Sequence, residues 1–418
     1  MLPSFAADRI MTTRLWAIAI VATIAVITAI GVAVHRPVPK SIKIGYAISL
    51  SGPNAPGASM TVLPNYRLWV QEVNAAGGIM LRNVGKRVPI EVVEYDDQSK
   101  VDKALEAVES LVKTDRVDFM LAPWGTGLNL AVGPLFNSAG YPHLAVTAMS
   151  DQAPELAKRW PNSFWFLGTM THAAESLVAT LNTLRSEGKL GKTVAMVSVA
   201  DQLGIGFAKA ARKELEKGGF DIVYDRSYTV GQKDMFATIA EAKQLNPESF
   251  LAFSYPPDTM AITEQARASN FNPKVFYAAI GTAFPLYRER FGVDVEGIMG
   301  TGGWNPNAPE SKDYRQRHLE ATGQEPDRWA SPITYASLQM LQQAIERVGE
   351  IDCAATIKEL QTGTFQTILG PTKLENNFYM QSWWVGQWQN GEYYGVSPVT
   401  LPGAQAIIFP KPAWGPDR

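Results

Sequence analysis

The fold is decided by SIKIGYAISLSGPNAPG (residues 41–57), because this stretch joins a short apolar strand to a polar loop that contains glycine and proline. Residues 41–48 predict the strand and residues 49–57 the loop. A helix then runs to Ala76 and ends at Gly77-Gly78, a normal C-terminal signal. The same order of strand, loop and helix predicts a parallel sheet with crossover helices.

The pattern continues along the chain in two series. The first has strands at 88–97, 118–122 and 143–146, with helices at 101–112 and 128–139. The second begins near Phe164, with strands at 193–199, 221–228, 249–255 and 274–280 and helices at 205–217, 235–244 and 259–269. A glycine- and proline-rich stretch (297–309), a long helix (332–348) and a hairpin turning at Asn390-Gly391 follow.

These patterns predict an α/β fold of two doubly wound parallel-sheet lobes, joined by a hinge that the chain crosses several times. We expect residues 1–40 to be a signal peptide or an N-terminal membrane anchor. Lobe 1 is predicted from residues 41–163 plus 299–375, and lobe 2 from residues 164–298 plus 376–418.

The export signal is an unbroken apolar run, Leu15–Val34, preceded by Arg9 and Arg14. The run is long enough to span a bilayer, so a cleaved signal and a retained anchor both remain open. Met11 is an alternative start. No cysteine lies near the end of the run, which excludes a lipid-anchored mature N-terminus. The remainder of the chain belongs in the periplasm or another extracytoplasmic space, free or tethered to the inner membrane.

Composition excludes several classes of partner and site. The 418 residues carry 38 Lys and Arg against 40 Asp and Glu, a net charge of −2, which offers no electrostatic excess to nucleic acid. The single cysteine, Cys353, cannot form an internal disulfide and is interpreted as a small buried hydrophobic residue. The sequence has no G-x-S-x-G, H-E-x-x-H or phosphate-loop motif, and its four histidines are scattered. We therefore expect no enzyme, no cofactor and no metal site, and a monomer.

Ligands of parallel sheets bind beyond the carboxyl ends of the strands. The loops at those ends are predicted at Ser49–Gly57, Pro123–Gly127, Thr147–Ala153, Ala200–Gly206, Ser254–Thr259 and Ile280–Phe284.

At these loops the sequence resembles the type I periplasmic binding proteins, specifically the branched-chain amino-acid-binding (Leu/Ile/Val-type) receptors of ABC transporters. The resemblance covers Ser41 to about Pro410 and is carried by the order of IKIGYAISLSGPNAPG, YDDQS, APWGTG, GYPHLAVTAMSDQAPEL, DQLGIGFA, EQARASN and QWQNGEYYGVSP. It implies a receptor that closes its lobes on a small solute and delivers it to an inner-membrane ABC permease.

The resemblance also implies the ligand-binding residues. In that family two loops of the first lobe hold a carboxylate, and the equivalent positions here are Gly125-Thr126 and Ala148-Met149-Ser150. Helix N-termini suit this role because their N–H groups bind anions without a full cation. Thr126 and Ser150 are also read as ordinary caps of the helices that follow. Trp124 beside the first loop and Trp304 in a crossing between lobes are either stacking partners for a planar ligand or packing residues.

The second lobe departs from the family pattern. Tyr255 occupies the aromatic position, but Leu203 stands where the family often has another aromatic residue, and Ile280 stands where amino-acid receptors have the acid that neutralises the ammonium group. A buried ammonium without a counter-charge costs several kcal/mol. Asp201 and Asp258 are candidates to replace that acid, although each also fits a helix cap.

The sequence thus predicts a small organic carboxylate without a free α-amine, with aromatic carboxylates among the candidates. A branched-chain or other amino acid, an amide, and a membrane-tethered sensor ectodomain remain the alternatives.

Overall fold

The computed structural model describes residues 38–415. Its first sheet is parallel, with β1 (Ile42–Ile48) between β4 (Ile90–Asp96) and β5 (Phe119–Leu121). The helices that connect and cover these strands are α2 (Ala55–Thr61), α3 (Leu63–Ala75), α4 (Val101–Ser110) with a π-helical turn (Leu111–Asp115), α5 (Thr126–Ala139) and α6 (Ala153–Arg159). Beside them lie the antiparallel pair β2 (Ile79–Leu81) and β3 (Lys86–Val88) and the parallel pair β6 (His143–Ala145) and β7 (Ser163–Trp165).

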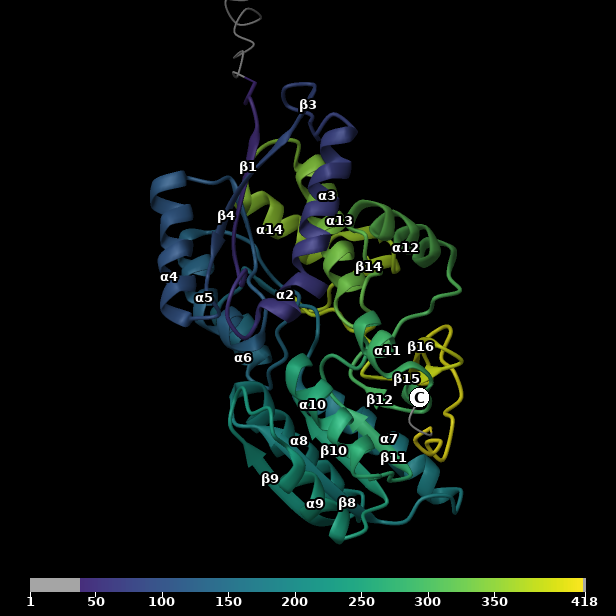
Figure 1. Cartoon of the computed structure of the whole chain (residues 1–418). Helices are drawn as coiled ribbons and strands as arrows, with labels where there is room; N and C mark the ends of the chain where they lie inside the picture. The colour runs from purple at the N-terminus through teal and green to yellow at the C-terminus, as the bar shows by residue number, and fades with distance from the viewer. Residues whose placement is uncertain (1–37, 416–418) are drawn as a thin grey trace, which may run out of the picture. The chain divides into compact units, whose positions relative to one another are not determined.

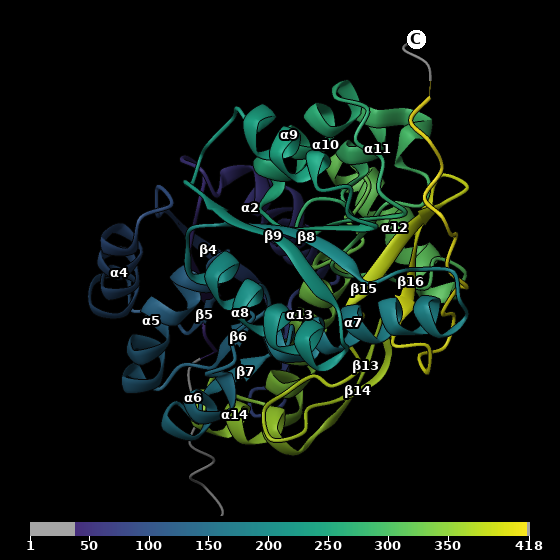
Figure 2. The same ribbon diagram turned by 90° about the horizontal axis from the view of Figure 1, so that it is seen from below.

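The second sheet has seven strands in the order β16-β15-β12-β11-β10-β8-β9. They are β8 (Thr193–Val199), β9 (Asp221–Tyr228), β10 (Ser249–Phe253), β11 (Val275–Ala278), β12 (Met299–Gly300), β15 (Val385–Gln389) and β16 (Glu392–Ser397). The pairs β12–β15 and β15–β16 are antiparallel, and the other neighbouring strands are parallel. Figure 2 shows the C-terminal β15–β16 hairpin in yellow beyond β8 and β9. The accompanying helices are α7 (Met170–Ser186), α8 (Gln202–Lys217), α9 (Phe236–Gln244), α10 (Pro256–Ala268) and α11 (Pro285–Phe291), with a 3-10 turn (Gly292–Val295).

A third group of elements packs with the first sheet although it follows β12 in the chain. It comprises α12 (Pro309–Thr322), α13 (Ser331–Val348), α14 (Cys353–Thr362) and the hairpin of β13 (Thr364–Thr367) and β14 (Gly370–Lys373). α12 and α13 contact α3, as Figure 1 shows. The chain therefore passes between the two sheets after β7, again after β12 and again after β14.

The predicted fold class is confirmed, and the second series of strands agrees closely with the sequence pattern. The predicted strands at 193–199 and 221–228 are β8 and β9. The β15–β16 turn has φ of 52° at Asn390 and 78° at Gly391, the two positive values that a type I′ turn requires.

Other boundaries were wrong or missed. The loop predicted to end at Gly57 ends at Asn54, and the helix predicted as continuous is divided at Val62, just before Pro64. The helices α6, α7, α11 and α12 and the β13–β14 hairpin had no counterpart in the prediction. The apolar run Leu15–Val34 lies outside the described residues. Among residues 38–415, no helix combines the length and apolar character needed to cross a membrane.

One of the four histidines and the single cysteine have structural roles. His143 begins β6 and is fully buried, which lowers its pKa to about 3. Its ring nitrogens lie 3.0 Å from Asn129 Oδ1 and 3.1 Å from Ser163 Oγ. Cys353 is half-buried rather than fully buried, and its thiol donates to the carbonyl of Asp118 at 3.2 Å. Burial raises the pKa of that thiol to about 12, so it stays protonated.

Candidate ligand-binding site

The predicted binding residues gather around one small cavity, which we call the cleft site. Loops after β5 and β6 supply one wall, and the starts of α8 and α10 with the loop after β11 supply the other. The cavity measures about 10 Å³, and its lining residues are Trp124, Gly125, Thr126, Thr147, Met149, Leu203, Tyr255, Ile280 and Trp329. The structure thus brings together all the predicted residues except Ala148 and Ser150.

Hydroxyl groups lock the two loops of the first wall together. Thr126 Oγ1 accepts a hydrogen bond from the backbone N–H of Met149 at 3.2 Å. Thr147 Oγ1 accepts one from the backbone N–H of Gly125 at 2.9 Å. Thr126 is the first residue of α5, whose N-cap is Gly125 and has no side-chain cap, so the capping role considered for Thr126 does not apply.

The first turn of α5 provides the free donors of this wall. The backbone N–H groups of Thr126, Gly127 and Leu128 precede the first intrahelical bond, which runs from Asn129 to the carbonyl of Gly125 at 3.2 Å. α5 has 14 residues, so its partial positive charge also acts at this end. An anionic oxygen placed here would meet N–H donors without needing a cation.

Ala148 and Ser150 do not line the cleft site. Ser150 accepts a hydrogen bond from the backbone N–H of Gln152 at 3.2 Å, while its own N–H donates to the carbonyl of Gly168 at 3.4 Å. Ser150 therefore shapes the turn before α6, whose N-cap is Gln152. Ala148 is fully buried behind the loop.

Tyr255 projects from the end of β10 with two carboxylates behind it. Asp201 caps α8 by accepting from the N–H of Gly204 at 2.9 Å and also hydrogen-bonds Tyr255. Asp258 accepts from the Tyr228 hydroxyl at 3.2 Å, and burial raises its pKa to about 6. Burial and these negative charges keep the Tyr255 phenol protonated by raising its pKa. Both acids are thus engaged as caps and phenol partners, and neither lines the cleft site.

Ile280 contributes an apolar surface where the sequence comparison expected an acid. Its side chain is 1% exposed, and its backbone is fixed by an N–H bond to the carbonyl of Ser254 at 3.0 Å and by a bond of 2.6 Å from Thr259 Oγ1 to its carbonyl. Among residues 38–415, those that line the cleft site include no carboxylate side chain.

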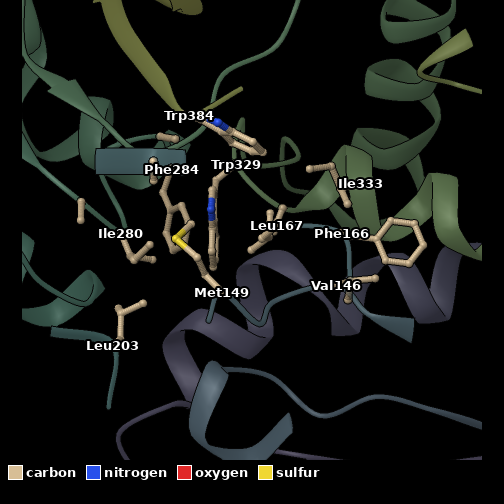
Figure 3. Packing of buried hydrophobic residues seen from close by; sticks show 14 of the residues in the cluster. Val146, Met149, Phe166, Leu167, Leu203, Ile280, Phe284, Trp329, Ile333 and Trp384 are labelled. Atoms are coloured by element: carbon tan, nitrogen blue, oxygen red, sulfur yellow. The ribbon is translucent and has the colours of Figure 1, made fainter. Parts of the chain in front are cut away.

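Two tryptophans close the cleft site. The Trp124 ring lies 5.7 Å from the Tyr255 ring, across the site, and 6.5 Å from the Trp329 ring, edge to face. Both indole N–H groups are buried and have no hydrogen-bond partner among the described residues. In the view of Figure 3, Met149, Phe284 and Ile280 lie on one side of the Trp329 indole.

Trp329 and Thr147 were missed by the sequence reasoning. Thr147 begins a loop that the prediction included, and its position at the end of a strand was the available signal. Trp329 precedes the predicted helix at 332–348, and Asp327 prepares that helix by accepting backbone N–H bonds of 2.7 Å from both Trp329 and Ala330. An acid at capping distance before a long helix, followed by a large aromatic residue, was the signal for Trp329.

Trp304, the other tryptophan considered, lies elsewhere. It is buried in the segment after β12, and the guanidinium of Arg328 lies 4.9 Å from its ring centre. It does not line the cleft site.

The chain is similar to several known binding proteins. The Leu/Ile/Val-binding protein of Escherichia coli K12 is 25% identical over 332 residues, which are 79% of this chain and 86% of that protein. The branched-chain amino acid transporter substrate binding protein LivJ from Streptococcus pneumoniae, solved with isoleucine, has a TM-score of 0.73 and 21% identity, over 89% of this chain and 100% of that one. A solute binding protein of an ABC transporter from R. palustris, solved with benzoate, has a TM-score of 0.74 and 19% identity, over 88% and 99%.

The family match extends over residues 41–392, from β1 to the first residue of β16, and so includes the first sheet, the second sheet apart from the rest of β16, and every residue that lines the cleft site. The chain belongs to the periplasmic binding protein family.

Proposed function

We propose that the chain is the extracytoplasmic solute receptor of an ABC importer and that its ligand is a small organic carboxylate without a free α-amine. Aromatic carboxylates are the leading candidates. The proposal is supported by the family, by the donors on the first wall of the cleft site and by the apolar second wall.

The observation that carries the ligand class is the lack of a carboxylate side chain among the described residues that line the cleft site. An ammonium group held against Ile280 and Leu203 would lose its water and gain no counter-charge, at a cost of several kcal/mol. A ligand without an amine avoids that cost and gains apolar contacts instead.

The donors around the site match a carboxylate. The free N–H groups at the start of α5 suit one oxygen, and the partnerless indole N–H groups of Trp124 and Trp329 are further donors for a ligand with several acceptor positions. The rings of Trp124 and Tyr255 supply planar surfaces for an aromatic ligand. Benzoate, the ligand of the R. palustris receptor, has this combination of groups.

The mechanism that we propose is closure of the two lobes. The space of about 10 Å³ at the cleft site holds on the order of one water molecule, so a ligand enters only when the two walls separate. Closure on the ligand restores contacts from both walls at once, which favours the closed state. An inner-membrane permease would then recognise the closed receptor. The lobe boundaries are those predicted from the sequence, with residues 1–40 as the export signal or anchor.

Thermal unfolding with a panel of amino acids, aromatic and aliphatic carboxylates, and amides tests this assignment. A ligand at about a hundred times its dissociation constant adds roughly 2.7 kcal/mol of stability. We expect benzoate-like carboxylates to stabilise the protein and leucine to have no effect. Stabilisation by leucine and isoleucine instead would retain the receptor and refute the argument about the amine.

Ile280→Glu sharpens the test, with Ile280→Gln as the neutral control of equal size. The glutamate is expected to weaken the binding of aromatic carboxylates at least tenfold, because it places a negative charge beside the ligand. It is also expected to create measurable binding of amino acids. If the glutamine and glutamate variants behave alike, Ile280 does not occupy the position that faces the ligand's amine.

A branched-chain amino acid is the second candidate, because the E. coli relative is a Leu/Ile/Val-binding protein. For that ligand the ammonium would need Asp201 or Asp258 to leave its helix-capping bonds. Asp201→Asn and Asp258→Asn would then abolish amino-acid binding, whereas carboxylate binding would survive at least one of them.

A further inference from the structure

A second, larger cavity lies beside the cleft site, and we call it the aromatic cavity. It measures about 250 Å³ and is built from the segments in which the chain passes between the two sheets after β12 and β14. Its main walls are Trp304, Trp329, Trp383, Tyr379, Ile333 and Leu369. An apolar cavity of about 150 Å³ suffices for benzene in other proteins, so this space has room for a substituted aromatic ring.

The walls of the aromatic cavity are held in place from behind. Trp383 packs closely against the backbone at Gly395, where a Cβ would lie only 2.3 Å from the indole ring. Gly303, at φ 148°, allows the same close approach, since a Cβ there would lie 2.6 Å from the Cα of Gly395. Trp304 is supported by Arg328, whose guanidinium lies 4.9 Å from its ring centre. Aromatic surfaces fixed in this way form a preorganised site rather than a loosely packed gap.

The indole N–H groups of Trp304 and Trp329, which line the aromatic cavity, are buried and have no hydrogen-bond partner among the described residues. Tyr379 also lines this cavity, and the residue is only 5% exposed. Burial raises the pKa of the phenol, so the group stays neutral and able to donate. Buried polar groups are normally satisfied, so the two indole N–H groups are candidate contacts for a bound molecule, and the Tyr379 hydroxyl is a further donor that can be removed while its ring is kept.

The charged residues that line the aromatic cavity indicate which kind of molecule can bind there. No lysine or arginine lines the aromatic cavity, and Glu310 on an exposed part of its lining is the one charged side chain among the described residues there. An anionic group is therefore disfavoured in this space, in contrast to the cleft site. Trp329 lines both spaces, so a molecule in one touches the wall of the other.

We propose that the aromatic cavity is a second binding site, which takes an uncharged aromatic group that carries a hydrogen-bond acceptor for these donors, the Tyr379 hydroxyl among them. This group is either a separate small molecule or the far end of an extended ligand whose carboxylate lies in the cleft site. The first source is independent of the proposed function, and the second rests on it.

Titration of the full chain with acetophenone, followed by ligand-detected NMR, tests the cavity alone, because acetophenone has no carboxylate. Toluene serves as the probe of similar shape without an acceptor. We expect saturable acetophenone binding that Tyr379→Phe weakens about fivefold, the loss of one hydrogen bond, while toluene is unaffected. Tyr394→Phe, a tyrosine outside the cavity, is the matched control. Leu369→Trp should fill the space and abolish binding of both probes.

A long arylalkanoate such as 6-phenylhexanoate, compared with benzoate, separates the two sources. Selective weakening of the arylalkanoate by Leu369→Trp, with benzoate unchanged, assigns the cavity to the tail of a cleft ligand. Acetophenone binding without that effect assigns it to a separate molecule. The proposal is overturned if neither probe binds saturably up to about 10 mM, if binding survives both cavity variants, or if tetramethylammonium binds in place of acetophenone.

Discussion

Gly57 determines where the Trp124 indole can lie, and Gly57→Ala is the sharpest test of the cleft site. A Cβ at Gly57 would lie 2.1 Å from Trp124 Cζ2 and 2.5 Å from Cε2. Ordinary contacts begin at about 3.4 Å, so the indole would have to move by more than 1 Å. Trp124 is only 1% exposed and contacts both Tyr255 and Trp329, so such a shift disturbs the opposite wall as well.

Two opposing effects give the expected magnitude. Overpacking in a well-packed core costs about 1–3 kcal/mol. Gly57 lies in α2 without a positive φ, so alanine recovers about 0.5–1 kcal/mol of helix preference. We expect a net loss of about 1–2 kcal/mol in unfolding free energy and about tenfold weaker binding of the best carboxylate ligand.

Urea unfolding and isothermal titration measure the two quantities. Gly127→Ala is the stability control, because it is a helical glycine whose Cβ would meet nothing within 4 Å, so its stability should stay level or rise. In a Trp124→Phe background the cost of Gly57→Ala should fall by at least about 1 kcal/mol, since the smaller ring vacates the space. An equal cost in both backgrounds, or no effect on binding, would show that this contact does not position the indole.

Three further predictions concern side chains around the site. Thr126→Ala should weaken carboxylate binding five- to tenfold, because the N–H that its hydroxyl satisfies is left unpaired, whereas Thr126→Ser should bind nearly normally in the same titration. Arg328→Met should lower the free energy of unfolding, measured with urea, by about 3 kcal/mol, because Arg328 is only 3% exposed and its replacement leaves Glu392 without this ion pair. Arg67→Met, which removes an exposed ion pair with Glu94, is the control and should cost under about 1 kcal/mol. The free energy of unfolding should fall as the pH rises from about 4 to 6, because burial raises the folded-state pKa of Asp258 to about 6. Asp258→Asn should reduce this fall by on the order of 2 kcal/mol in the same urea unfolding experiments. An unchanged pH dependence in the variant would contradict the role given to Asp258.

Local sequence patterns were enough to predict the strands of the sheets, but not which distant residues become neighbours in space. The strand at 193–199 is apolar throughout and buried in the structure, so pattern and environment agree. The carboxyl ends of parallel strands meet at one edge, which is why loops far apart in sequence were correctly expected to face each other. The β13–β14 hairpin was missed because its strands have only four residues each, too short for a periodic signal.

Within the cleft site, the sequence could indicate loops but not which residue of a loop turns toward the cavity. Met149 and Ser150 are adjacent, yet only Met149 lines the cavity, because Ser150 bonds to Gln152 and Gly168. Trp329 reaches Trp124 from a position about two hundred residues later in the chain. Such a contact depends on how segments far apart in the sequence pack together, which no local pattern encodes.

The proposed ligand class likewise rests on a few side chains rather than on the fold. Receptors with nearly equal TM-scores to this chain were solved with isoleucine and with benzoate, so the shared architecture accommodates ligands with and without an ammonium group. What differs between such ligands is the need for a counter-charge on the second wall. In this chain Ile280 lies at that wall with its backbone fixed at both ends, and the nearby acids are committed to helix caps and phenols. To neutralise an amine, those bonds would have to break, whereas a carboxylate that enters when the two walls separate would meet free donors at the start of α5 on a wall that keeps its own hydrogen bonds.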